Sequence, residues 1–149
     1  MKQITLPSAQ VLNAPEPLNN RLQHAGWLPS GDEPLQPKQL LGVLLAFNLR
    51  QLGVDDTTVM LSLRHLREQL QEVAEQTHAS FLTDDDAPLS PLIVTLVDYR
   101  YAFWPGDDQF FDMKTLNYIS NLSRPPAVTC TLHLASLYMQ GLQDYGQES

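Results

Sequence analysis

The chain has 149 residues, of which 43% are hydrophobic, 17% charged and 8% aromatic. This length suits one domain, or two small interlocked lobes, and the composition is too apolar for a disordered chain. Seventeen acidic residues against nine basic ones give a formal net charge of −8 at pH 7, which works against unspecific attraction to nucleic acid or to an anionic membrane. Any contact with DNA therefore requires a local basic patch.

Cysteine usage and hydropathy indicate the compartment. The single cysteine, Cys130, excludes an internal disulfide and a zinc site built from several cysteines. The first twelve residues contain no continuous apolar segment, and no stretch approaches 18 uncharged apolar residues. We therefore expect a cytoplasmic protein that makes no contact with a membrane.

The first half of the chain is predicted to be helical. Pro37 suits a first helical turn, Gly53 suits the position just past a helix end, and the acidic pair at 55–56 suits a helix N-terminus. After a short strand at Ile4, helices are expected over residues 7–12, 18–25, 37–52 and from 55–56 to about Gln76. The helix that begins at Pro37 has so few polar positions that it should be buried on most sides.

The last of these helices carries an apolar stripe whose members alternate by steps of four and three, the a/d spacing of a short coiled coil. The stripe consists of Val59, Leu63, Leu66, Leu70 and Val73. Two interpretations are open. The stripe packs either against a second copy of the chain or inside one chain as an ordinary amphipathic core.

The segment 78–91 is predicted to be a linker, since it combines three consecutive aspartates with Pro88 and Pro91 and shows little periodicity. The acidity is concentrated after residue 80, where nine acidic residues stand against three basic ones. The predicted organisation is a helical lobe over 1–77, the linker, and a β-rich lobe over 92–149 that mediates dimerisation or partner binding.

In the second lobe, residues 92–103 are predicted to form a strand that is covered on both faces at its start. TrpProGlyAsp at 104–107 is typical of a turn, after which 110–113 returns as a hairpin partner. Residues 127–134 alternate as a half-buried strand, and a helix is expected over about 136–145. The fold class is α+β, with the helical lobe followed by a small antiparallel sheet and a C-terminal helix.

A more specific pattern precedes the long helices. Two short helices flank AsnAlaPro at 13–15, as in a helix-turn-helix, and GlyTrpLeuPro at 26–29 and a polar excursion at 30–34 follow. LeuArgGlnLeuGlyValAsp at 49–55 then separates two further helices. From residue 4 to about residue 70 this order resembles the winged helix-turn-helix domain of MerR-type transcription regulators. The recognition helix and the wing are divergent, since LeuAsnAsnArgLeuGln at 18–23 replaces the family's usual run and its glycine-tyrosine-arginine element is absent.

The resemblance implies a sequence-specific transcription regulator that binds an inverted-repeat operator as a homodimer. Leu18 and Leu22, four residues apart, are expected to face the core. The remaining side chains of this helix carry groups that can contact base edges or phosphates in a major groove. With one further cation, the candidate DNA-binding residues are Asn19, Asn20, Arg21, Gln23, His24 and Lys38.

Enzyme activity, cofactors and metal sites are not expected. The four histidines are scattered through different elements, and the chain contains no nucleophile-elbow, phosphate-loop or dinucleotide-binding pattern. The run Asp84–Asp86 lacks a phosphate-binding glycine loop and is typical of a solvated linker. Cys130, on the apolar face of a predicted strand, is expected to be a small buried hydrophobic residue.

Aromatic residues gather around the hairpin of the second lobe, where they either complete the core of the sheet or form a surface for a partner. The candidate dimer interface consists of Val59, Leu63, Leu66, Leu70, Val73, Tyr101 and Phe103. The expected partners are double-stranded DNA, a second copy of the chain and another protein at the C-terminal lobe. The alternative function is a protein-binding adaptor or inhibitor on a winged-helix scaffold that does not read DNA.

Overall fold

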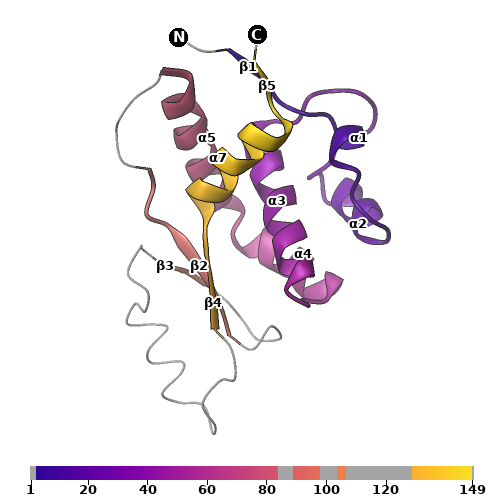
Figure 1. The fold of residues 1–149 in the computed structure, drawn as a ribbon. Helices are drawn as coiled ribbons and strands as arrows, with labels where there is room; N and C mark the ends of the chain where they lie inside the picture. The colour runs from indigo at the N-terminus through magenta and orange to yellow at the C-terminus, as the bar shows by residue number, and fades with distance from the viewer. Residues whose placement is uncertain (1–2, 84–88, 98–103, 107–128, 149) are drawn as a thin grey trace, which may run out of the picture.

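The computed structural model describes residues 3–83, 89–97, 104–106 and 129–148, and it confirms the α+β class (Figure 1). The helices lie together, and a small antiparallel sheet projects from them. In chain order the elements are β1 (Ile4–Thr5), α1 (Ala9–Leu12), α2 (Leu18–His24), α3 (Pro37–Gln51), α4 (Asp56–His65), α5 (Arg67–Thr83), β2 (Ile93–Val97), β3 (Trp104–Gly106), β4 (Thr129–His133), α7 (Leu134–Tyr145) and β5 (Gln147–Glu148).

Helices α3, α5 and α7 pack against one another and form the centre of the molecule. As predicted, α3 starts at Pro37, is buried along most of its length and ends before Gly53, whose φ of 94° suits glycine. Helix α7 approaches α3 closely at Gly141, where a Cβ atom would overlap the side chain of Leu44. The C-terminal helix is therefore part of the same core as the N-terminal helices.

The short helices α1 and α2 lie within the ranges expected for them. Asn13 ends α1 in the left-handed conformation, with φ of 50°. The polar excursion at 30–34, expected as a wing, forms no strand pair of its own. Its bridge to the described part of the chain joins Pro34 to Ser8, beside a hydrogen bond from the Leu35 amide to the Pro7 carbonyl. The end of this stretch therefore pairs with the residue before α1 and not with a hairpin partner within 30–34.

The single helix expected from residues 55–56 to Gln76 is instead two helices, α4 and α5, which meet at Leu66. One turn before the break, the Ser62 hydroxyl donates to the Thr58 carbonyl at 2.7 Å, a side-chain bond that often bends helices. Helix α5 continues to Thr83, six residues into the segment predicted as a linker. Its contact with α7 explains the extension, since burial on a neighbouring helix stabilises turns that the local sequence leaves marginal.

The apolar stripe lies inside the chain, the second of its two interpretations. Four of its five side chains have no exposed area, and the fifth, Val73, is 2% exposed. The four are Val59, Leu63, Leu66 and Leu70. Because these side chains already contact the core of their own chain, they offer no surface to a second copy. Tyr101 and Phe103, the other candidates for the dimer interface, lie outside the described residues.

The sheet has the strand order β3-β2-β4, antiparallel throughout, with Leu96 opposite Cys130. The strand predicted over 92–103 is observed as β2 over 93–97, and its residues 93–96 are buried, as predicted for a strand covered on both faces. The remaining predicted positions, 98–103, lie outside the described residues. The turn predicted at 104–107 is wrong over 104–106, which pair with β2 as β3. Pro105 is compatible with this position because β3 lies at the edge of the described sheet, where a strand can lack a ladder N–H. The hairpin partner expected at 110–113 lies outside the described residues.

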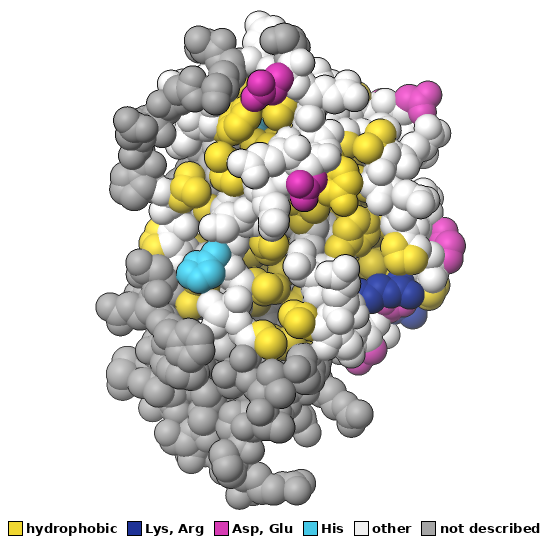
Figure 2. Space-filling view, viewed as in Figure 1, with side chains coloured by type: hydrophobic (Ala, Val, Ile, Leu, Met, Phe, Trp, Pro, Cys, Tyr) yellow, Lys and Arg dark blue, Asp and Glu magenta, His cyan; other side chains and the backbone are white. Residues whose placement is uncertain are grey.

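Figure 2 shows the face over α3 and α7, where hydrophobic and uncharged side chains predominate and an acidic side chain lies near the middle. The Lys and Arg side chains visible on it gather at one edge, on the side of α2 and α4. At the end of the helices that lies away from the three-stranded sheet, β1 and β5 pair antiparallel and bring the two ends of the described chain together (Figure 1). Within the described part of the chain, no helix is both long enough and apolar enough to cross a membrane.

Candidate nucleic-acid interface

Helix α2 presents a polar surface to solvent because its two leucines face the core. Leu18 and Leu22 are fully buried, as predicted. Four of the remaining side chains that were proposed to contact DNA are exposed, and Asn19 is half-buried. The exposed ones are Asn20, Arg21, Gln23 and His24.

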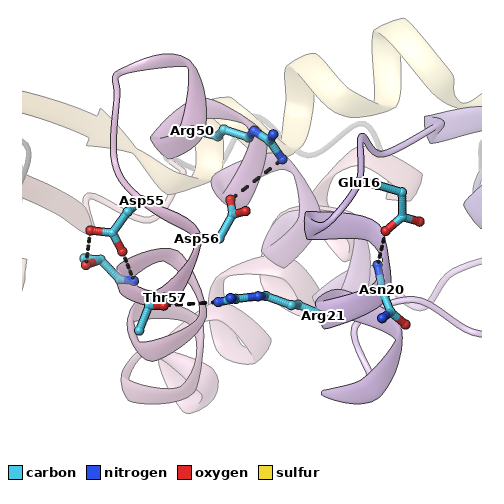
Figure 3. A network of polar contacts seen from close by, with 8 residues as sticks. Glu16, Asn20, Arg21, Arg50, Asp55, Asp56 and Thr57 are labelled. Atoms are coloured by element: carbon cyan, nitrogen blue, oxygen red, sulfur yellow. Dashed lines mark hydrogen bonds and ion pairs between the residues drawn. The ribbon is translucent and has the colours of Figure 1, made fainter.

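A carboxylate occupies the N-terminal end of α2. Glu16 accepts a hydrogen bond from the Asn19 side-chain amide at 2.9 Å. It accepts another from the Asn20 backbone N–H at 3.3 Å (Figure 3). This placement suits the positive end of the helix dipole. Asn19 is therefore engaged with a side chain of its own chain, whereas the side chain of Asn20 extends into solvent.

Arg21 is exposed, but its side chain is turned toward α4. Its Nη1 donates to the Thr57 hydroxyl at 3.2 Å, so the guanidinium lies against the first turn of α4 (Figure 3). The position of Thr57 is fixed by the cap of that helix, since the Asp55 carboxylate accepts from the Thr58 amide at 2.8 Å and from its hydroxyl at 3.1 Å. These bonds, led by the backbone amide of Thr58, hold the pKa of Asp55 below its usual value of 3.8.

Beside Arg21 a groove of about 380 Å³ runs between α2 and the junction of α4 with α5. We call it the arginine groove. Its described lining has three guanidinium groups, four apolar side chains and one hydroxyl, and no carboxylate. The lining residues are Arg21, Ala25, Trp27, Thr57, Met60, Leu61, Arg64 and Arg67.

Trp27 holds one wall of the groove in place. Its side chain is 6% exposed and packs against Gly42 of α3, where a Cβ atom would overlap the indole ring. Leu61, which also lines the groove, is 59% exposed. The groove therefore combines a rigid aromatic wall with an exposed apolar side chain and three positive charges.

Arg64 and Arg67 were missed in the sequence, although both lie on the polar side of the apolar stripe. The sequence places Arg64 and Arg67 on either side of Leu66, and these two neighbouring cations were the signal that could have indicated a basic site. Neither guanidinium makes an ion pair with another described residue. Of the five Lys and Arg side chains that the structure describes, three line this one groove.

The other two described cations lie elsewhere. Lys38 is half-buried in the first turn of α3 and does not line the groove, so the structure does not bring it together with Arg21. Arg50 points to Asp56, with 3.7 Å between Nη1 and Oδ1 (Figure 3). This ion pair partly neutralises Arg50 on the α3 side of α4.

Several titratable groups of the described residues lie outside the arginine groove. Within the described residues no group of three His, Cys, Asp or Glu side chains could hold a metal ion. The buried Tyr138 of α7 lies next to the half-buried His78 of α5, with 2.8 Å between Oη and Nδ1. Burial lowers the pKa of His78 and raises that of Tyr138. Cys130 packs against the core as a small apolar residue, but it is half-buried, whereas the sequence predicted a buried one.

Comparisons of the chain with protein-family models, with curated proteins and with solved structures gave no match.

Proposed function

We propose that the protein binds double-stranded DNA through α2 and the arginine groove and acts as a transcription regulator. The observation that carries the proposal is the position of three arginines next to the exposed polar face of α2. A chain with a net charge of −8 needs a local basic patch to approach DNA, and this groove supplies one. The order of the first four helices, which resembles that of MerR-type regulators, supports the same function.

The exposed side chains of α2 have the chemistry to distinguish base pairs. The amides of Asn20 and Gln23 can each donate to and accept from an adenine edge, and His24 can bond to either purine. Within the described residues, no side-chain hydrogen bond engages Gln23 or His24. These three residues therefore form the base-reading surface in our proposal.

Assembly as a homodimer on an inverted repeat is part of the proposal, because two-fold symmetric operators match two-fold symmetric proteins. The stripe from Val59 to Val73 does not supply the interface, since it is buried within one chain. The remaining candidates are Tyr101 and Phe103 in the second lobe.

A second function is favoured by one specific observation. Carboxylates flank α2 on both sides, Glu16 before it and Asp32 and Glu33 after it, and they would repel a DNA backbone that lay along the whole helix. In this alternative the protein is an adaptor or inhibitor, and the groove binds an acidic segment of another protein.

A mobility-shift titration of the intact protein against the DNA upstream of its own gene separates the two functions. We expect a specific complex that survives excess unrelated competitor duplex. The double variant Asn20→Ala/Gln23→Ala should lose the preference for that DNA, whereas Gln143→Ala, an exposed glutamine on α7, should bind like the wild type. Absence of any complex with the wild-type protein at low salt would refute DNA binding and favour the adaptor.

A further inference from the structure

The arginine groove owes its positive charge to its three arginine side chains. Both N-terminal helix turns (α4 and α5) and C-terminal helix ends (α2 and α4) line it, so the partial charges of the helix ends offset one another. No described carboxylate lines it to offset the charge of the arginines. An anionic group is therefore the ligand that the groove would attract most strongly.

Arg67 occupies a position that local helix energetics disfavour. It is the first residue of α5, a helix of 17 residues, at the end where the dipole attracts anions and repels cations. Arg64, in the last turn of α4, suits its own helix end, but it brings a second positive charge to the same junction. The two arginines thus place like charges together in the absence of an anion.

Arg21 is directed away from the surface that would meet base edges. Its bond to Thr57 at 3.2 Å holds the guanidinium over the groove with Arg64 and Arg67, on the α4 side of α2. The exposed residues Gln23 and His24, in contrast, make no side-chain bond to a described residue. The guanidinium of Arg21 therefore lies at the arginine groove, whereas the uncharged polar groups of α2 lie on its exposed face.

We propose that the arginine groove is a clamp for the DNA backbone, in which Arg21, Arg64 and Arg67 bind the phosphodiester groups that flank the major groove read by α2. This inference rests on the proposed function and deepens it. It assigns Arg21 to phosphate and leaves sequence discrimination to Asn20, Gln23 and His24. Backbone contacts fix the position of the protein on the duplex but carry no sequence information.

The first experiment tests the groove without DNA. Inorganic pyrophosphate is titrated into the intact, ¹⁵N-labelled protein, and the Nε–Hε signals of the arginines are followed by NMR. The signals of Arg21, Arg64 and Arg67 should shift together and saturate, whereas that of Arg50, paired with Asp56, should move little. Equal shifts at all four arginines, or shifts that never saturate, would overturn the clamp.

The second experiment separates backbone binding from base reading. Arg21→Gln, Arg64→Gln and Arg67→Gln are each titrated against the promoter duplex and a scrambled duplex at several salt concentrations, with Arg50→Gln as the charge-matched control. Each groove variant should weaken binding to both duplexes by the same factor and reduce the slope of log K against log salt by about 0.9. The control should keep the wild-type slope.

The outcomes distinguish the clamp from the proposed function. If Arg21→Gln weakens binding to the promoter alone and keeps the wild-type slope, Arg21 reads a base, and the clamp is overturned while DNA binding stands. If the wild type binds neither duplex, the proposed function fails, and DNA is overturned as the occupant of the groove even where pyrophosphate binds.

Thermal melts of Arg67→Gln test whether Arg67 has a merely structural role. Because Arg67 opposes the helix dipole, Arg67→Gln should melt at or above the wild-type temperature while it binds DNA more weakly. A variant that melts lower, and whose affinity loss follows its melting temperature, would overturn the assignment of Arg67 to the clamp.

Discussion

The contact between Trp27 and Gly42 sets the wall of the arginine groove, and Gly42→Ala tests it. In a helix interior this substitution normally stabilises a protein by about 1 kcal/mol, because alanine has the higher helix propensity. Here the added methyl group would overlap the indole ring, which is 6% exposed and cannot move aside without losing its own burial. Such overpacking costs about 1–3 kcal/mol. We therefore expect a net loss of about 1 kcal/mol.

A double-mutant cycle with Trp27→Leu separates the two contributions. Leucine is shorter than tryptophan and should leave room for the methyl group, so Gly42→Ala should stabilise the Trp27→Leu protein by about 1 kcal/mol. Urea denaturation followed by circular dichroism gives all four free energies of unfolding. If Gly42→Ala stabilises the wild-type protein by about 1 kcal/mol as well, the indole does not lie against α3, and the described wall of the groove is wrong.

Three further predictions concern the core, the pH dependence and the charge near α2. Leu63→Ala should cost about 2–5 kcal/mol at every protein concentration, because Leu63 is buried within one chain; a loss that depends on concentration would indicate a dimer seam. Burial lowers the pKa of His78 from 6.5, so the folded state binds fewer protons than the unfolded state. Stability should be fully present above about pH 6.5 and fall as the pH drops through the folded pKa, and thermal melts of His78→Gln should show a shallower fall; equal pH profiles would contradict this. Glu16→Gln should strengthen binding to the promoter duplex by about 3-fold at low salt, as measured by fluorescence anisotropy, and an unchanged affinity would place α2's N-terminus away from phosphate.

The helices that local signals mark were predictable from the sequence. Pro37 and Gly53 bracket α3, and the spacing of Leu18 and Leu22 correctly assigned the buried face of α2. The break at Leu66 was not predictable, because no glycine or proline marks it and the stripe continues across it. The end of α5 at Thr83 depends on contact with α7, far along the chain, which a local pattern cannot reveal.

Only the α2 part of the candidate site could be predicted from the sequence. Its α2 side chains follow from a helical face, but the groove brings Arg21 next to Arg64 and Arg67 only through the packing of α2 on α4. The same packing turns Arg21 toward Thr57, which no spacing rule predicts. The strand at 104–106 was missed for a related reason, since TrpProGlyAsp carries strong turn residues that an edge strand also tolerates.

The most direct test of DNA binding through α2 and the arginine groove is chemical-shift mapping of the intact ¹⁵N-labelled protein with the promoter duplex. The account predicts that the largest backbone and arginine side-chain shifts fall on α2 and on the junction from Arg64 to Arg67, while the exposed glutamines of α7, Gln140 and Gln143, stay unchanged. Shifts centred on α7, or a spectrum that the duplex leaves unaltered, would contradict it.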